Sequence, residues 1–193
     1  MAEVVLFHHV LGLTSGVVAF ADRLRTGGHT VRTPDLYDGR TFETVADGAS
    51  YRDEIGFGEL VQRGVRSVDG LPAELVYAGF SLGVLPAQYL AQTRAGARGA
   101  LLFESFVPVT EFGDGWPAGL PVQVHGMDAD PFFAGEGDVD EARTLVDTTP
   151  GAELFLYPGD KHLFADNSLP SYEPAAAELL EQRVLEFLDR GVR

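Results

Sequence analysis

The 193-residue sequence predicts one α/β domain over residues 1–193, with a mostly parallel sheet of about six strands and helices on both faces. Three observations predict this class. Short apolar runs, many of them β-branched, alternate with helical patterns along the whole chain. No repeat or long linker divides the sequence. The length and the apolar content of 45% allow one buried core, although the chain has no cysteine to cross-link it.

The first half of the chain begins with an apolar strand at residues 4–7. Residues 17–26 follow as a helix that Gly27 and Gly28 close, and residues 29–33 form a second strand before Pro34. A less regular helical pattern covers residues 47–68, after a long loop expected at residues 35–50. The buried face of the first helix should comprise Val17, Phe20, Ala21 and Leu24.

The second half continues the alternation. The pattern predicts strands at residues 75–78, 99–103, 121–125 and 153–157. It predicts helices at residues 84–91, 138–146 and 174–189. Pro174 lies in the first turn of the last helix, and Gly191 lies just past its end. A second long loop, residues 107–120, carries the single tryptophan, Trp116. Loops of that length at a sheet edge often shape a pocket.

The segment Gly79-Phe80-Ser81-Leu82-Gly83 connects a predicted strand to a predicted helix. Strand, G-x-S-x-G and helix form the context of a nucleophile elbow, in which glycines permit a sharp turn. The Ser81 side chain would lie at a helix N-terminus, where partial positive charge favours developing negative charge. Taken alone the pattern is weak, because the chain has 23 glycines and Ser81 could be a helix N-cap.

Two histidines and several aspartates follow Ser81. His125 falls within or at the end of a predicted strand, so we expect a hydrogen-bonded structural histidine. His162 lies in the loop after the strand at residues 153–157, where sites of parallel sheets gather. Asp128 and Asp130 also lie just past a strand. Nucleophile, acid and base candidates therefore each follow a separate strand, in the chain order that an elbow serine requires.

Residues 8–12, 79–83, 127–132 and 157–164 together resemble the dienelactone hydrolase family of α/β-hydrolases, over nearly the whole chain. The resemblance implies a minimal, capless α/β-hydrolase fold, without the extra N-terminal strands of larger members. It implies that Ser81 attacks an acyl carbon, that His162 transfers the proton, and that an aspartate orients the imidazole. Asp130 matches the family's acid because it directly precedes Pro131, and Asp128 is the alternative. The oxyanion hole would use the backbone N–H groups of Val10 and Leu82.

Three positions depart from that family. Its best-known members carry cysteine at the elbow, where this chain has Ser81, so the serine depends more strictly on its base. Their first-loop glutamate is matched by His9, which either contacts substrate or packs within the loop. Their substrate-gripping arginine is matched by Asp166, whose charge would repel an anionic lactone. A neutral or cationic ester is therefore expected, in a pocket that Trp116 and Phe132 help to line.

The net charge of −15 predicts that the protein repels nucleic acid and anionic lipid. No metal or other cofactor is expected, because the acidic stretch at residues 128–140 lacks calcium-loop spacing and His8 and His9 face opposite ways. The N-terminus lacks a signal-peptide pattern, and no apolar run could span a membrane, so a cytoplasmic location is expected.

The sequence thus predicts a serine hydrolase that cleaves a small carboxylic ester or lactone through an acyl-serine intermediate. The alternative is a hydrolase-fold protein that binds a small ligand or a partner without turnover. Acyl transfer to an acceptor other than water would use the same residues.

Overall fold

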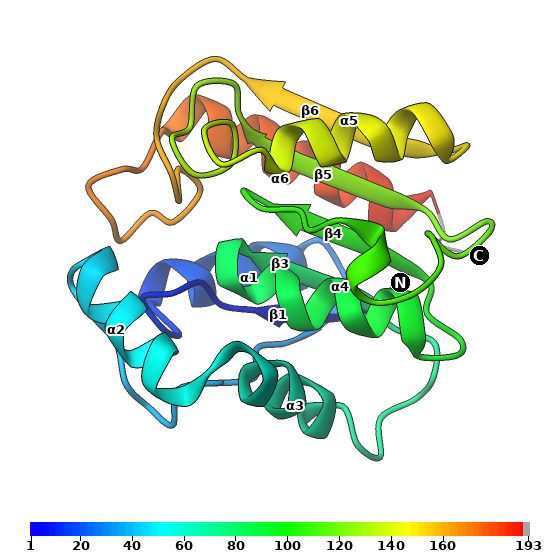
Figure 1. Cartoon of the computed structure of the whole chain (residues 1–193), viewed down its shortest axis with the longest axis horizontal. Helices are drawn as coiled ribbons and strands as arrows, with labels where there is room; N and C mark the ends of the chain where they lie inside the picture. Colours follow the sequence, from blue (N-terminus) through cyan, green and yellow to red (C-terminus); the bar gives the residue numbers. More distant parts are fainter. Residues whose placement is uncertain (191–193) are drawn as a thin grey trace.

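The computed structural model describes residues 1–190; residues 191–193, with the predicted helix-ending Gly191, lie outside the described part. A single six-stranded sheet runs in the order β2-β1-β3-β4-β5-β6, and every neighbouring pair is parallel. The predicted parallel sheet is confirmed. Figure 1 shows α4 and α5 in front of this sheet and α1 and α6 behind it.

The strands are β1 (Glu3–Phe7), β2 (Thr30–Arg32), β3 (Val76–Phe80), β4 (Gly99–Phe103), β5 (Val122–Met127) and β6 (Ala152–Tyr157). The α-helices are α1 (Ser15–Thr26), α2 (Val45–Ile55), α3 (Phe57–Ser67), α4 (Val84–Thr93), α5 (Asp138–Thr148) and α6 (Pro174–Asp189). Short 3-10 helices occur at η1 (Ser81–Gly83) and η2 (Val109–Glu111). Within residues 1–190, no helix combines the length and the apolar character needed to cross a bilayer.

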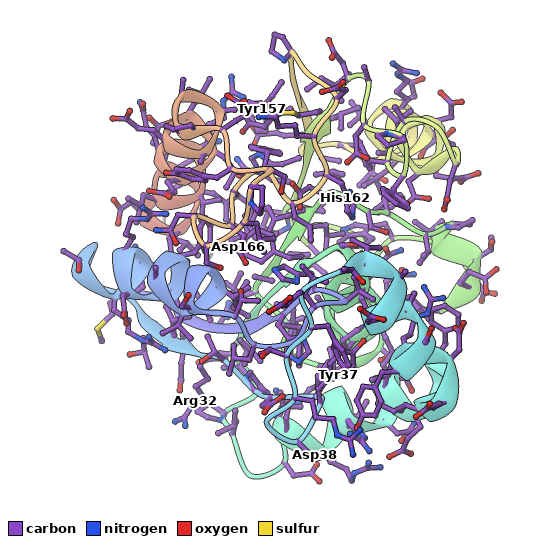
Figure 2. All side chains as sticks on the ribbon, turned by 90° about the vertical axis from the view of Figure 1, so that its left-hand side faces the viewer. Arg32, Tyr37, Asp38, Tyr157, His162 and Asp166 are labelled. Atoms are coloured by element: carbon purple, nitrogen blue, oxygen red, sulfur yellow. The ribbon has the colours of Figure 1, made fainter. Side chains whose placement is uncertain are left out.

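The carboxyl ends of four neighbouring strands bring distant segments to one edge of the sheet. Because β3, β4, β5 and β6 are parallel neighbours, the loops that follow them lie side by side. His162 and Asp166 lie on the loop between β6 and α6, beyond Tyr157 at the end of β6 (Figure 2). Residues 81 positions apart in sequence, Ser81 and His162, can therefore share one site.

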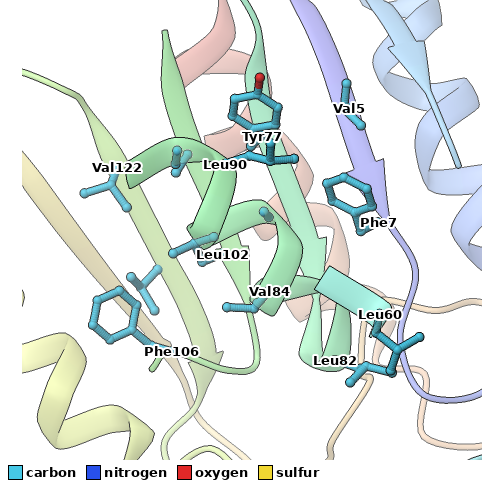
Figure 3. Packing of buried hydrophobic residues seen from close by; sticks show 14 of the residues in the cluster. Val5, Phe7, Leu60, Tyr77, Leu82, Val84, Leu90, Leu102, Phe106 and Val122 are labelled. Atoms are coloured by element: carbon cyan, nitrogen blue, oxygen red, sulfur yellow. The ribbon is translucent and has the colours of Figure 1, made fainter. Parts of the chain in front are cut away.

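Each face of the sheet has its own hydrophobic core, because alternate side chains of a strand point to opposite faces. In β1, Val5 and Phe7 pack on the face covered by α3, α4 and α5, whereas Leu6 packs with α1 and α6. Figure 3 shows the first of these cores, with Val5, Phe7 and Tyr77 from the strands facing Leu90 from α4. The sheet that carries the loops is therefore covered by a buried apolar layer on each face.

The helical pattern predicted over residues 47–68 is two helices instead of one. Gly56 separates α2 from α3 with φ 84°, a left-handed conformation that favours glycine and interrupts the helix. Helix α2 also begins earlier, at Val45, where the Thr44 hydroxyl accepts a hydrogen bond from the Asp47 N–H at 3.1 Å. Part of the long loop predicted at residues 35–50 is therefore helical.

The pattern placed the start of α2 at residue 47 instead of Val45 and did not separate α2 from α3, because α2 has almost no buried apolar face. Gly48 is its single buried residue, and a Cβ there would lie 2.3 Å from the carbonyl oxygen of Val10. The glycine thus lets α2 approach the loop that follows β1. This places α2 over the carboxyl edge of the sheet.

Candidate active site

Ser81 sits on the sharp turn between β3 and η1, with φ 46°. Such a left-handed conformation is strained for residues other than glycine. The flanking glycines are sterically required. A Cβ on Gly79 would lie 2.1 Å from the Gly83 carbonyl oxygen, and a Cβ on Gly83 would lie 2.5 Å from the Phe7 carbonyl oxygen. The turn is therefore pressed against the end of β1, with the serine at its apex.

Ser81, His162 and Asp130 form a continuous hydrogen-bonded chain. The Ser81 Oγ is 2.8 Å from Nε2 of His162, and Nδ1 of His162 is 2.7 Å from Oδ2 of Asp130. Since the Asp130 carboxylate accepts from Nδ1–H, Nε2 is left free to accept the serine proton. Asp130 is fully buried, and its other oxygen accepts from the Phe132 N–H at 2.8 Å.

Neighbouring groups shift the pKa of the His162 imidazole. Burial alone would lower its pKa, but the hydrogen bond to Asp130 and the negative charges of Glu104, Asp130 and Asp138 raise the pKa above its ordinary value. Asp128, the alternative acid, instead accepts a hydrogen bond from the Gly159 N–H at 3.0 Å. Its carboxylate stabilises the loop and does not contact His162.

A cavity of about 650 Å³ opens beside Ser81 and His162. Val10 and Leu82, the predicted oxyanion-hole residues, both line it. Its wall is apolar where α2, α3 and α4 contribute Val45, Phe57, Val61 and Leu85. Elsewhere it carries acidic side chains, namely Glu104, Glu111, Glu136 and Asp138.

His9 and Asp166 do not line this cavity, and their prediction as pocket residues is corrected here. Both are buried, and Nε2 of His9 lies 2.8 Å from Oδ2 of Asp166. That oxygen also accepts from the Thr14 hydroxyl at 2.5 Å, while the other oxygen accepts from the Ser168 N–H at 2.8 Å. The carboxylate is thus fully engaged behind the site. It cannot repel an anionic substrate in the way the sequence suggested.

These contacts determine which protonation state His9 and Asp166 each adopt. Burial would raise the pKa of Asp166, but the hydrogen bonds from His9, Ser168 and Thr14 lower it to about 2. Burial lowers the pKa of His9 despite the nearby carboxylate, so the imidazole is neutral. Its Nε2–H donates to Asp166, and its Nδ1 accepts from the Leu11 N–H at 3.2 Å. His9 is therefore the packed loop histidine of the two alternatives.

The prediction of Trp116 as a residue of the substrate pocket is also corrected. Its indole N–H donates to the Leu120 carbonyl oxygen at 2.8 Å, and the side chain lines a separate hollow beside α5. Phe132 does line the cavity, with its ring centroid 4.7 Å from that of His162 and 40% of its surface exposed. His125 lies inside β5 with Nδ1 2.9 Å from the Tyr157 hydroxyl, as expected for a structural histidine.

One site residue was missed by the sequence reasoning. Glu104 directly follows β4, is 1% exposed, and lines the cavity with Ser81 and His162. The signal was present, because an acid immediately past the strand at residues 99–103 repeats the pattern that singled out Asp130. Among residues 1–190, no cluster of three or more His, Asp or Glu side chains could hold a metal ion.

Comparisons with known proteins agree with this architecture. A family model described as the dienelactone hydrolase family matches residues 1–191. A search of the curated proteins finds no match.

Three solved structures illustrate the likeness. A dienelactone hydrolase-like promiscuous phosphotriesterase from metagenomic libraries has a TM-score of 0.74 and 19% identity, covering 98% of this chain and 86% of its own. The mouse α/β hydrolase domain-containing protein 10 has a TM-score of 0.70 and 15% identity, with coverages of 97% and 90%. Esterase 2 of Thermogutta terrifontis, phosphonylated by sarin, has a TM-score of 0.69 and 16% identity, with coverages of 99% and 84%.

At such identities the three structures establish the α/β-hydrolase fold alone. The family model is the stronger finding, since it spans nearly the whole sequence. The chain belongs to the dienelactone hydrolase family.

Proposed function

We propose that this protein is a serine hydrolase that cleaves a small, neutral or cationic carboxylic ester or lactone through an acyl-serine intermediate. The observation that carries the proposal is the hydrogen-bonded chain from Ser81 through His162 to Asp130, at the wall of an accessible cavity. A serine hydroxyl is a poor nucleophile until an adjacent base accepts its proton, and this geometry supplies that base.

The reaction follows from these positions. Ser81 Oγ attacks the carbonyl carbon while its proton passes to Nε2 of His162, and the buried Asp130 carboxylate stabilises the imidazolium. The carbonyl oxygen becomes negative and is stabilised by the N–H groups of Val10 and Leu82. The bond to the alcohol oxygen then breaks, and Nε2 returns the proton to that oxygen. Water repeats the sequence on the acyl-Ser81 ester, which releases the carboxylic acid and restores the serine.

The charge of the cavity supports a neutral or cationic substrate. Glu111 and Glu136 contribute exposed carboxylates to its wall. Arg52 is the basic residue among the lining side chains, and its guanidinium is paired with Asp53 at 2.8 Å. An anionic group in the cavity would therefore meet net repulsion. A cytoplasmic location, the lack of a nucleic-acid or membrane partner, and hydrolysis in preference to acyl transfer remain parts of this proposal.

The test is intact-mass analysis after treatment with a fluorophosphonate, which forms a stable phosphonyl ester on activated serines. We expect one adduct on the wild type, none on Ser81→Ala, and much slower labelling of His162→Ala. Phosphonylation of the T. terrifontis esterase by sarin makes this class of probe a natural choice. Folded wild-type protein that gains no adduct would refute the proposal and favour a binding protein without turnover.

A further inference from the structure

The carboxyl edge of the sheet carries one more acidic residue than a serine triad needs. In the strand order β3-β4-β5-β6, Ser81 follows β3, Asp130 lies after β5, and His162 lies after β6. Glu104 follows the intervening β4. Topology therefore places this carboxyl group between the nucleophile and the acid, in the wall of the same cavity.

The contacts of Glu104 tie it to the loop that carries the base. Its Oε1 accepts a hydrogen bond from the N–H of Phe164 at 2.8 Å, two residues beyond His162. Its own N–H donates to the His125 carbonyl oxygen at 2.6 Å. The β6–α6 loop is thus anchored to the end of β4, with the imidazole next to the anchor.

Glu104 also carries two features that packing does not explain. Its φ is 62°, a left-handed conformation that is unfavourable for residues other than glycine. Its Oε2 is buried and has no hydrogen-bond partner within residues 1–190. A buried carboxyl oxygen without a donor is disfavoured, so a glutamate kept here in a strained conformation indicates a role in the chemistry.

We propose that Glu104 is a second carboxyl group acting on His162: Oε1 fixes the histidine loop, and Oε2 stabilises the imidazolium that forms when Ser81 gives up its proton. Glu104 is therefore a positioning residue that acts through the base. The inference rests on the proposed serine hydrolase, because only that reaction creates the imidazolium.

The electrostatics of the site agree with this role. The charges of His162, Asp130 and Asp166 shift the pKa of Glu104. The charge of Asp138 also acts on the pKa of His162. Burial, reinforced by the neighbouring carboxylates, raises the pKa of Glu104 to about 7, although positive charge on His162 opposes this shift. The Glu104 carboxyl group and the His162 imidazole therefore influence each other's ionisation.

The variant Glu104→Gln separates charge from anchoring. Glutamine keeps a carbonyl oxygen that can accept from the Phe164 N–H but carries no negative charge. Loss of that charge should lower the pKa of His162, because an ionised Glu104 favours the imidazolium. The midpoint of the acidic limb of the pH–rate profile should therefore move to lower pH. The plateau rate should also fall, because the imidazolium is less stabilised as it forms.

The rate constant for fluorophosphonate labelling of Ser81 measures both effects from about pH 5 to about pH 9, without knowledge of the substrate. For Glu104→Gln we expect a midpoint lower by about half a pH unit or more and a plateau reduced by about tenfold. Asp160→Asn is the control, because it removes a charge from an exposed position on the loop that carries His162. Its midpoint and plateau should equal those of the wild type.

The outcomes separate the two proposals. No labelling of the wild type would overturn the serine hydrolase and this inference together. Labelling of the wild type with an unchanged midpoint and plateau in Glu104→Gln would overturn the role of Glu104 alone. Should Glu104→Gln not fold, NMR titration of the His162 ring in the wild type gives a second test. A pKa at or below the ordinary value of 6.5 would count against the inference.

Discussion

Replacing Asp166 with asparagine tests the buried network that links the loop after β1 to the loop that carries His162. The carboxylate accepts from Nε2 of His9 at 2.8 Å, from the Thr14 hydroxyl at 2.5 Å, and from the N–H of Ser168 at 2.8 Å. The Asp166 side chain is only 3% exposed, and His9 and Thr14 are buried with it, whereas Ser168 lies at the surface. The Asp166→Asn variant removes the charge and presents an amide N–H₂ to groups that are themselves donors.

The expected loss of folding stability follows from the pKa of the Asp166 carboxyl group. Hydrogen bonding holds the pKa of Asp166 at about 2 in the folded protein, against an ordinary value of 3.8. A difference of that size corresponds to about 2 kcal/mol of stability at neutral pH. Because the folded pKa is the lower one, this stabilisation is complete well above pH 3.8 and is lost as the pH falls toward 2. Roughly half of it should remain at about pH 3.

Urea unfolding of the wild type and Asp166→Asn, followed by circular dichroism and extrapolated to water, measures this contribution. At pH 7 the variant should be less stable by about 2 kcal/mol or more, and the difference should narrow in the acidic range. Asp160→Asn, which removes an exposed carboxylate from the loop that carries Asp166, should change little at any pH. A difference below about 0.5 kcal/mol, or one that does not change with pH, would refute the reasoning.

Two further substitutions test the site itself. Asp130→Asn should reduce the rate of Ser81 labelling by about 10³- to 10⁴-fold at neutral pH, because an amide no longer holds Nδ1–H of His162 in place. A loss below about tenfold in folded protein would contradict the assignment of Asp130. Phe57→Ala removes a half-exposed ring from the apolar wall of the cavity. Its kcat/KM for p-nitrophenyl hexanoate should fall about 5- to 10-fold more than that for the acetate, since about 1 kcal/mol of apolar contact is lost; equal losses for both esters would show that the ring does not contact the acyl chain.

The sheet and the Ser81, Asp130 and His162 candidates were predictable because each depends on a local pattern. An apolar run marks a strand, and a parallel sheet brings the residues after its strands to one edge. Asp130 and His162 could be placed near Ser81 without knowledge of their distances. The same logic would have included Glu104, had every acid after a strand been considered.

Other features could not be predicted because they depend on contacts between distant segments. His9 and Asp166 are 157 positions apart, and nothing local shows that they pair with each other instead of facing a ligand. Trp116 could have turned toward either hollow, and its hydrogen bond to Leu120 decides between them. Helix α2 lacks an apolar stripe, so its start at Val45 depends on the Thr44 cap and on packing on the first loop.

The shallow attachment of α2 has a consequence for how this enzyme scaffold can change. Helix α2 buries only Gly48, yet it supplies Val45 and Arg52 to the wall of the cavity. Substitutions on its cavity side therefore cost little folding free energy, whereas changes in β3 or α4 disturb the central core. Substrate preference can thus diverge through α2 while the catalytic machinery stays fixed. For directed evolution, Val45 and Arg52 are the positions of α2 to randomise first, because Tyr51 and Ile55 of the same helix pack against the core.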